Sequence, residues 1–127
     1  MSIAEHNLAD FIDVFCEKGY FSLEDTNKIL AAGKAYGLTP KIHINQFNAF
    51  GGVVMGVKHG ALSVDYLEEL NQNDIEALIK STTIPLALPL WPYFLGIPYT
   101  PAKTLIDAGL PLAIATDYNP APPLAAI

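Results

Sequence analysis

Apolar and polar residues follow two alternating spacings along the chain, which predicts repeated units of a strand followed by a helix. Short runs rich in branched and aromatic residues have the character of strands, and the segments between them repeat apolar residues at helical spacing. The expected strands are 11–17, 41–46, 61–67, 84–90 and 111–117, and the expected helices are 22–37, 48–59, 72–81 and 101–108. This alternation is typical of an α/β fold with a parallel sheet, here of about five strands and four connecting helices.

The first helix and the strand after it have clear local signals. Ser22 stands three residues before Asp25, as in a capping box, and Gly37 can end the helix. The strand alternates apolar Ile42 and Ile44 with polar neighbours. These signals predict a helix followed by a strand.

Polar residues gather at or near the carboxyl ends of the expected strands. They are Glu17, His43, Asn45, Gln46, Asp65 and Asp117. In α/β sheets and barrels this edge holds the active site. An open sheet and a piece of a barrel both fit the pattern, whereas a closed eight-unit barrel needs about 250 residues, twice the 127 present.

Composition narrows the class of protein. With 51% hydrophobic and 16% charged residues the chain is globular, and its length suits one domain. A net charge of −6, without a cluster of Lys and Arg, disfavours nucleic acid as a partner. The single cysteine, Cys16, cannot form an internal disulfide, and neither a signal peptide nor a long apolar run stands out. We therefore expect a cytoplasmic protein without a membrane partner.

Some of the edge residues have more than one interpretation. His43 and Asp117 can hold a metal ion, but two ligands are fewer than a zinc site needs, so spacing alone favours a hydrogen-bonded pair. For Glu17, a solvated or helix-capping carboxylate is favoured over a general acid or base. Cys16 fits a buried core thiol, and the aromatic residues of 91–99 fit core and loop packing better than a ligand pocket.

Several segments, taken together, resemble imidazolonepropionase in order and spacing. They are 13–17, 41–47 with the glycine pair 51–52, 60–65, 93–95, 105–109 and 115–120. The resemblance implies a metal-dependent amidohydrolase with a (β/α)8 TIM-type barrel, of which this chain forms less than a third. It also implies hydrolysis of the cyclic amide C–N bond of 4-imidazolone-5-propanoate to N-formimidoyl-L-glutamate, in histidine degradation, with one zinc or iron ion in the complete site. The resemblance implies a small-molecule substrate as the partner, and it is compatible with a homodimer of the complete enzyme.

The resemblance also assigns roles to residues of this chain. It makes His43 and Asp117 metal ligands, with Asp117 also handling the proton of the attacking water. It makes Gln46 a contact to the substrate ring and Asn119 a contact to its propionate. Tyr66 occupies a catalytic position where relatives have a histidine, and a phenol with an ordinary pKa of about 10 is a poor base at neutral pH. The family's His-x-His pair, and its substrate-binding arginine, tyrosine and histidine, precede the matched region.

The last residues depart from the family pattern. Relatives continue after Asn-Pro as Gly-Ser-Ala-Pro-Ser-Gly-Asn-Met-Asn, whereas this chain ends with 121–127, Ala-Pro-Pro-Leu-Ala-Ala-Ile. Deleting one nucleotide from a suitable coding sequence for the family segment reproduces these residues and a stop codon. We therefore expect residues 1–120 to form the partial barrel and 121–127 to be a frameshifted tail.

Three hypotheses follow for the chain as a whole. The first is a fragment of an imidazolonepropionase, inactive by itself, whose open strand edges favour aggregation. The second is a small non-catalytic α/β binding or interaction protein derived from an amidohydrolase. The third is complementation, in which a separate chain supplies the missing strands.

Overall fold

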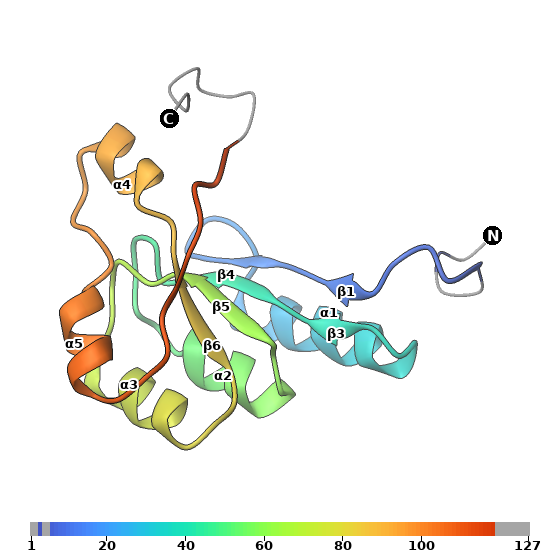
Figure 1. The fold of residues 1–127 in the computed structure, drawn as a ribbon. Helices are drawn as coiled ribbons and strands as arrows, with labels where there is room; N and C mark the ends of the chain where they lie inside the picture. The colour runs from blue at the N-terminus through green and yellow to red at the C-terminus, as the bar shows by residue number, and fades with distance from the viewer. Residues whose placement is uncertain (1–2, 4–5, 119–127) are drawn as a thin grey trace.

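The strands of the computed structural model, which describes residue 3 and residues 6–118, form a parallel sheet in sequence order (Figure 1). The main sheet contains β2 (Phe15–Cys16), β4 (Ile42–Ile44), β5 (Ser63–Tyr66), β6 (Ile84–Ala87) and β7 (Ala113–Ile114). Each strand pairs in parallel with the next. A doubly wound sheet reverses its strand order at a switch point, whereas consecutive units of a barrel do not. The sheet is therefore part of a barrel, which confirms the expected α/β class.

A two-stranded ladder extends the start of this sheet. It joins β1 (Phe11–Ile12) to β3 (Thr39–Pro40). Phe11 aligns with Thr39 and Phe15 with His43, so the offset between partners is the same in both ladders. Between them, the amide of Lys41 donates to the carbonyl of Ile12 at 2.8 Å. The expected strand 11–17 is therefore present but divided into β1 and β2, whereas the expected strand 41–46 is present as the shorter β4, and β3 precedes its predicted start.

Four helices follow the strands and lie on one side of the sheet (Figure 1). They are α1 (Leu23–Ala35), α2 (Gly52–His59), α3 (Gln72–Ile79) and α5 (Ala102–Asp107). The predicted capping box is present, because the amide of Asp25 donates to Ser22 Oγ at 3.1 Å and the Asp25 carboxylate accepts from the Ser22 amide. Asn71 and Asp74 form the same motif at α3. Among the described residues, no helix is both long and apolar enough to cross a membrane.

A fifth helix, α4 (Leu90–Leu95), lies above the sheet and was not expected from the sequence (Figure 1). The expected strand 84–90 is correspondingly too long, since β6 ends at Ala87. Pro89 lacks the amide proton that a continuing ladder would need, and it stands at the N-cap of α4 instead.

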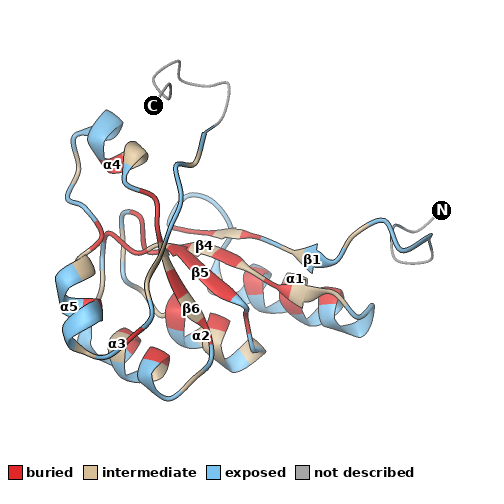
Figure 2. Ribbon diagram, in the orientation of Figure 1, coloured by how far each residue is buried: buried red, intermediate tan, exposed pale blue. Residues whose placement is uncertain are grey.

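The core lies between the sheet and the helices (Figure 2). Ile42, Ile44 and Val64 are fully buried. A Cβ atom at Gly56 of α2 would lie 3.1 Å from Ile42 and 3.2 Å from Val64, so these strand residues face the helices. Because side chains alternate along a strand, His43 faces the opposite side, which we call the open face. Cys16 is also fully buried, which confirms the expected core thiol, and burial raises its pKa.

Candidate active site at the open face of the sheet

Residues with a left-handed backbone lie at or shortly after the carboxyl ends of β4, β5 and β7. The φ angles are 56° at Asn45, 84° at Tyr66, 65° at Leu67 and 54° at Asp117. Such angles are uncommon outside glycine, cost on the order of 1–3 kcal/mol each, and cluster at functional sites. The backbone is therefore locally strained at the carboxyl edge of the sheet, where the candidate site residues were predicted to lie.

The left-handed turn at the end of β5 brings Tyr66 to the open face. Tyr66 pairs in register with Ile44, so regular alternation would send its side chain toward the helices. Its ring centroid instead lies 5.3 Å from that of His43 and 6.2 Å from that of Phe15. Leu67, which follows, is fully buried. The left-handed backbone at Tyr66 and Leu67 thus places the Tyr66 side chain on the open face and the apolar Leu67 side chain in the core.

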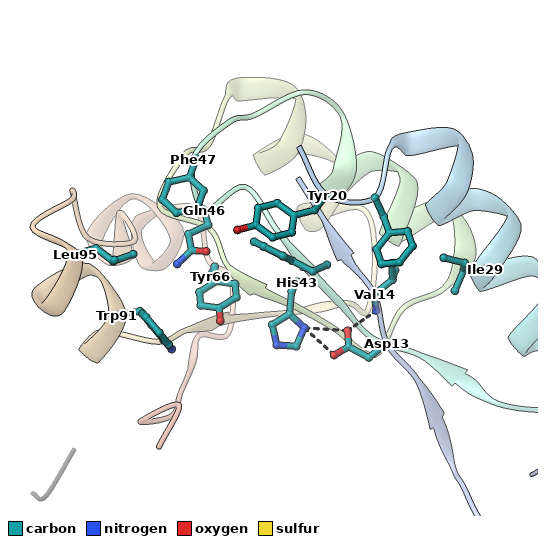
Figure 3. A pocket seen from close by; sticks show the side chains of 12 residues that line it. Asp13, Val14, Tyr20, Ile29, His43, Gln46, Phe47, Tyr66, Trp91 and Leu95 are labelled. Atoms are coloured by element: carbon teal, nitrogen blue, oxygen red, sulfur yellow. Dashed lines mark hydrogen bonds and ion pairs between the residues drawn. The ribbon is translucent and has the colours of Figure 1, made fainter. Parts of the chain in front are cut away.

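His43 is held by a carboxylate from the neighbouring strand segment (Figure 3). Its Nδ1 lies 2.9 Å from Oδ1 and 2.8 Å from Oδ2 of Asp13. Although partial burial lowers the pKa of His43, the hydrogen bond and charge of Asp13 outweigh this effect and hold the pKa above its ordinary value. The carboxylates of Asp65 and Asp117 add to this rise, so all three negative groups lie close enough to act on the imidazole.

The phenol of Tyr66 binds the expected aspartate. Tyr66 OH donates to Oδ2 of Asp117 at 3.0 Å. Burial, and next the charge of Asp117, raise the pKa of Tyr66 well above its usual range. The phenol is therefore a hydrogen-bond donor at neutral pH, in keeping with its expected weakness as a base.

Asp65 lies beside His43 in the sheet register and is nearly buried. The two residues are direct partners across β4 and β5, and Asp65 is 4% exposed. Burial raises its pKa, and Nζ of Lys41 lies 3.9 Å from its Oδ2. The other oxygen, Oδ1, has no hydrogen-bond partner within the described part of the chain.

Glu17 has a structural role that differs from the expected solvated or helix-capping one. It is 1% exposed, and its carboxylate accepts from the amides of Phe47 and Asn48 at 3.0 and 3.3 Å and from Nδ2 of Asn48 at 3.0 Å. The residue comes from the end of β2 and holds the loop between β4 and α2. Oε1 also accepts from the amide of Lys18 at 2.9 Å, so both oxygens of Glu17 have partners.

A second contact, between Asn45 and Asp74, anchors the start of the same loop. Nδ2 of the fully buried Asn45 donates to Oδ2 of Asp74, at the start of α3, at 3.0 Å. Gln46, which is 7% exposed, lies directly after this anchored turn and lines the cavity (Figure 3). Two buried carboxylates thus position the residue that the sequence predicts to contact substrate.

A cavity of about 650 Å³ lies over the open face. It is lined by Asp13, Val14, Phe15, Tyr20, Phe21, Ile29, His43, Gln46, Phe47, Tyr66, Trp91 and Leu95. Trp91 comes from α4, whereas Tyr93 and Tyr99 are 71% and 54% exposed. Of the expected core and loop packing of segment 91–99, the core part is wrong for the exposed Tyr93 and Tyr99, and Trp91 lines the cavity, as in the alternative interpretation.

The described residues fit part of a metal site. His43 and Asp117 supply an imidazole and a carboxylate, donors suited to zinc or iron. In residues 3 and 6–118, however, no three His, Cys, Asp or Glu side chains come together as a metal-binding group. These two side chains therefore fit a coordination shell without completing one. Asn119 and the tail 121–127 lie outside the described residues.

Asp13, Tyr20 and Phe47 line the cavity but were not identified as site residues from the sequence. One feature of the sequence could have indicated Asp13: it is a carboxylate among apolar neighbours, two residues before Phe15, which pairs with His43. That signal needs the strand register, which the sequence does not contain.

Comparison with curated proteins finds strong similarity to part of one enzyme family. The chain is 63% identical over 118 residues to an imidazolonepropionase of Flavobacterium johnsoniae, covering 93% of this chain and 29% of the relative. It is 59% identical, with the same coverage, to an imidazolonepropionase of Christiangramia forsetii. The chain thus spans less than a third of the length of these relatives. A scan against family models finds no match.

Solved structures with the same fold are more distant in sequence. An ochratoxinase of A. niger superposes with a TM-score of 0.66 at 16% identity, covering 94% of this chain and 33% of that protein. An adenosine deaminase of Xanthomonas campestris with bound zinc gives 0.63 at 14% identity, covering 85% and 28%. An amidohydrolase from a Sargasso Sea sample gives 0.59 at 17% identity, covering 83% and 24%. The chain is therefore homologous to imidazolonepropionase over 93% of its own length, and it has the fold of part of these larger solved structures.

Proposed function

We propose that this chain carries part of the active site of an imidazolonepropionase-like hydrolase, which opens the ring of 4-imidazolone-5-propanoate to N-formimidoyl-L-glutamate. The observation that carries the proposal is the meeting of His43, Tyr66 and Asp117, from three strands, beside one cavity. The 63% identity to an imidazolonepropionase supports this substrate over those of the distant structural neighbours.

His43 and Asp117 are the proposed ligands of one zinc or iron ion. Such an ion supplies Lewis-acid activation of the ring carbonyl and lowers the pKa of a bound water. The contact between Asp13 and the imidazole supports the assignment, since ligating histidines commonly donate their second nitrogen to a carboxylate. A catalytic zinc site commonly has three protein ligands, so these two need at least one more from elsewhere.

The remaining site residues bind and orient the substrate. Gln46 has an amide that can donate and accept at the ring, and Phe47 and Trp91 provide apolar walls for a planar heterocycle. Tyr66 donates a hydrogen bond from its hydroxyl to Asp117 and so orients the carboxylate that is proposed to take the water's proton. Asn119 stays the proposed contact to the propionate.

The isolated chain is proposed to be inactive, because its described residues hold only part of the expected ligand set. One observation favours the non-catalytic binding protein as a second candidate: the cavity of about 650 Å³ is formed although that ligand set is incomplete. Three expectations remain predictions: one zinc or iron ion, a cytoplasmic location and a homodimer of the complete enzyme.

A chimera with a complete relative tests the proposal. The matching segment of the Flavobacterium johnsoniae enzyme is replaced by that of this chain, and turnover of imidazolonepropionate is measured with added zinc or iron. We expect turnover that His43→Ala abolishes and that His59→Ala, a change outside the cavity lining, preserves. A folded chimera without turnover, or one unaffected by His43→Ala, would contradict the proposed function.

A further inference from the structure

The contact between Asp13 and His43 indicates which ring nitrogen of the imidazole carries the proton. Both carboxylate oxygens of Asp13 lie within 2.9 Å of Nδ1 of His43 (Figure 3). An ionised carboxylate can only accept hydrogen bonds. Nδ1 must therefore carry the proton, which leaves Nε2 of the neutral ring with its lone pair.

The main chain holds the two partners in place. Oδ1 of Asp13 accepts a second hydrogen bond, from the amide of Val14, at 2.8 Å. The carbonyl of Val14 in turn accepts from the amide of His43 at 3.0 Å, within the ladder that joins the two strand segments. Carboxylate and imidazole are thus bound to adjacent points of one parallel ladder, which limits rotation of both side chains.

Other polar groups near the ring have contacts of their own. The hydroxyl of Tyr66 donates to Asp117, and Asp65 lies close to the ammonium of Lys41. Asp13 contacts Nδ1 of the ring with both of its carboxylate oxygens, at 2.9 and 2.8 Å. It is therefore the group best placed to select one tautomer.

We propose that Asp13 is a positioning residue, which fixes His43 as its Nδ1–H tautomer and so presents Nε2 as a ligand atom at the cavity. The tautomer follows from the contact itself, whereas the identity of the atom that Nε2 binds rests on the proposed function. Partners of this kind orient ligating histidines and raise their basicity.

Nitrogen NMR of the histidine rings in the 127-residue chain tests the tautomer directly. At a pH where His43 is neutral, we expect the proton on Nδ1 in the unmodified chain and a mixture of tautomers in Asp13→Asn, whose amide can both donate and accept. His59, whose Nε2 lies 2.8 Å from Oδ1 of Asn27, provides an internal reference that should not change. Protonation of His43 at Nε2 in the unmodified chain would overturn the proposal, whether or not the variant folds.

Metal titration separates this inference from the proposed function. In the active chimera loaded with Zn²⁺, we expect Asp13→Asn to raise the metal dissociation constant about 10- to 100-fold and Asp13→Glu to restore part of the loss. Asp107→Asn, which removes an ion-pair partner of Lys103 on α5, should leave it unchanged. An unchanged constant in folded Asp13→Asn would overturn the positioning role even if turnover persists. Failure of the unmodified chimera to bind metal while His43 holds its proton on Nδ1 would instead contradict the proposed function and leave the tautomer assignment supported.

Discussion

The two faces of the sheet use the same strands for different purposes. On the helix-covered face, Ile42, Ile44 and Val64 are fully buried and apolar. On the open face, Phe15, His43 and Asp65 form one aligned row across three strands. Because side chains alternate along a strand, the residues that stabilise the fold and the candidate site residues lie on opposite faces of the sheet. A substitution on one face should therefore have little effect on the other.

The largest effect on the fold should come from the covered face. Ile42→Ala removes a fully buried side chain that α2 packs against, so we expect a loss of about 2–5 kcal/mol in the free energy of unfolding. Urea denaturation followed by circular dichroism measures it. Ile114→Ala, at a side chain that is 71% exposed, is the control and should change stability by less than about 0.5 kcal/mol. Similar losses for both would show that burial against the helices does not decide the stability.

Glu68, at the end of β5, should make stability depend on pH. The residue is 6% exposed, and burial raises its pKa to about 7. Because the folded chain keeps this proton while the unfolded chain loses it, the contribution of Glu68 to stability should be fully present below about pH 4.5 and be lost as the pH rises to about 7, a change of about 3 kcal/mol. Glu68→Gln should remove this part of the dependence, with Glu76→Gln, at an exposed position of α3, as control. Identical curves of unfolding free energy against pH for Glu68→Gln and the unmodified chain would refute it.

The open face should respond in activity more than in stability. In the chimera, Tyr66→His is expected to raise kcat about 100-fold, since a positioned general acid or base typically contributes 10²- to 10⁴-fold and the protonated phenol is a poor base. Tyr66→Phe, which keeps the ring and loses the bond to Asp117, should not raise kcat. The measurement is kcat and KM from pH 6 to 9. A tyrosine enzyme that is already as fast as the histidine variant would show that Tyr66 is a working substitution.

The smallest effect should come from the contact between the turn after β4 and the start of α3. Asp74→Ala removes the acceptor of Asn45 Nδ2 and part of the cap of α3, and we expect a loss of about 1–2 kcal/mol. Unfolding in urea measures it, and Gln72→Ala on the exposed side of α3 is the control. A loss no greater than in the control would mean that the buried contact contributes little.

Much of the architecture was determined by signals that are local in the sequence. The capping box of Ser22 and Asp25, the alternation at Ile42 and Ile44 and the glycine after α1 each depend on neighbours a few residues apart. The polar residues at the strand ends were predicted in the same way, because parallel strands bring their carboxyl ends to one edge. The aperiodic run at 90–95 carried no such signal, and its helix was missed.

The tertiary structure decided what these residues touch. Asp13 meets His43 only through the register of two strands, and Glu17 is drawn from the candidate site into a loop by amides about thirty positions away. The left-handed backbone at Tyr66 places a phenol on the face opposite to the one that alternation assigns. Register and positive φ angles depend on packing between distant segments, whereas periodicity and caps depend on near neighbours. The sequence by itself could therefore determine the elements and their order, but not the contacts that make an edge of the sheet into a site.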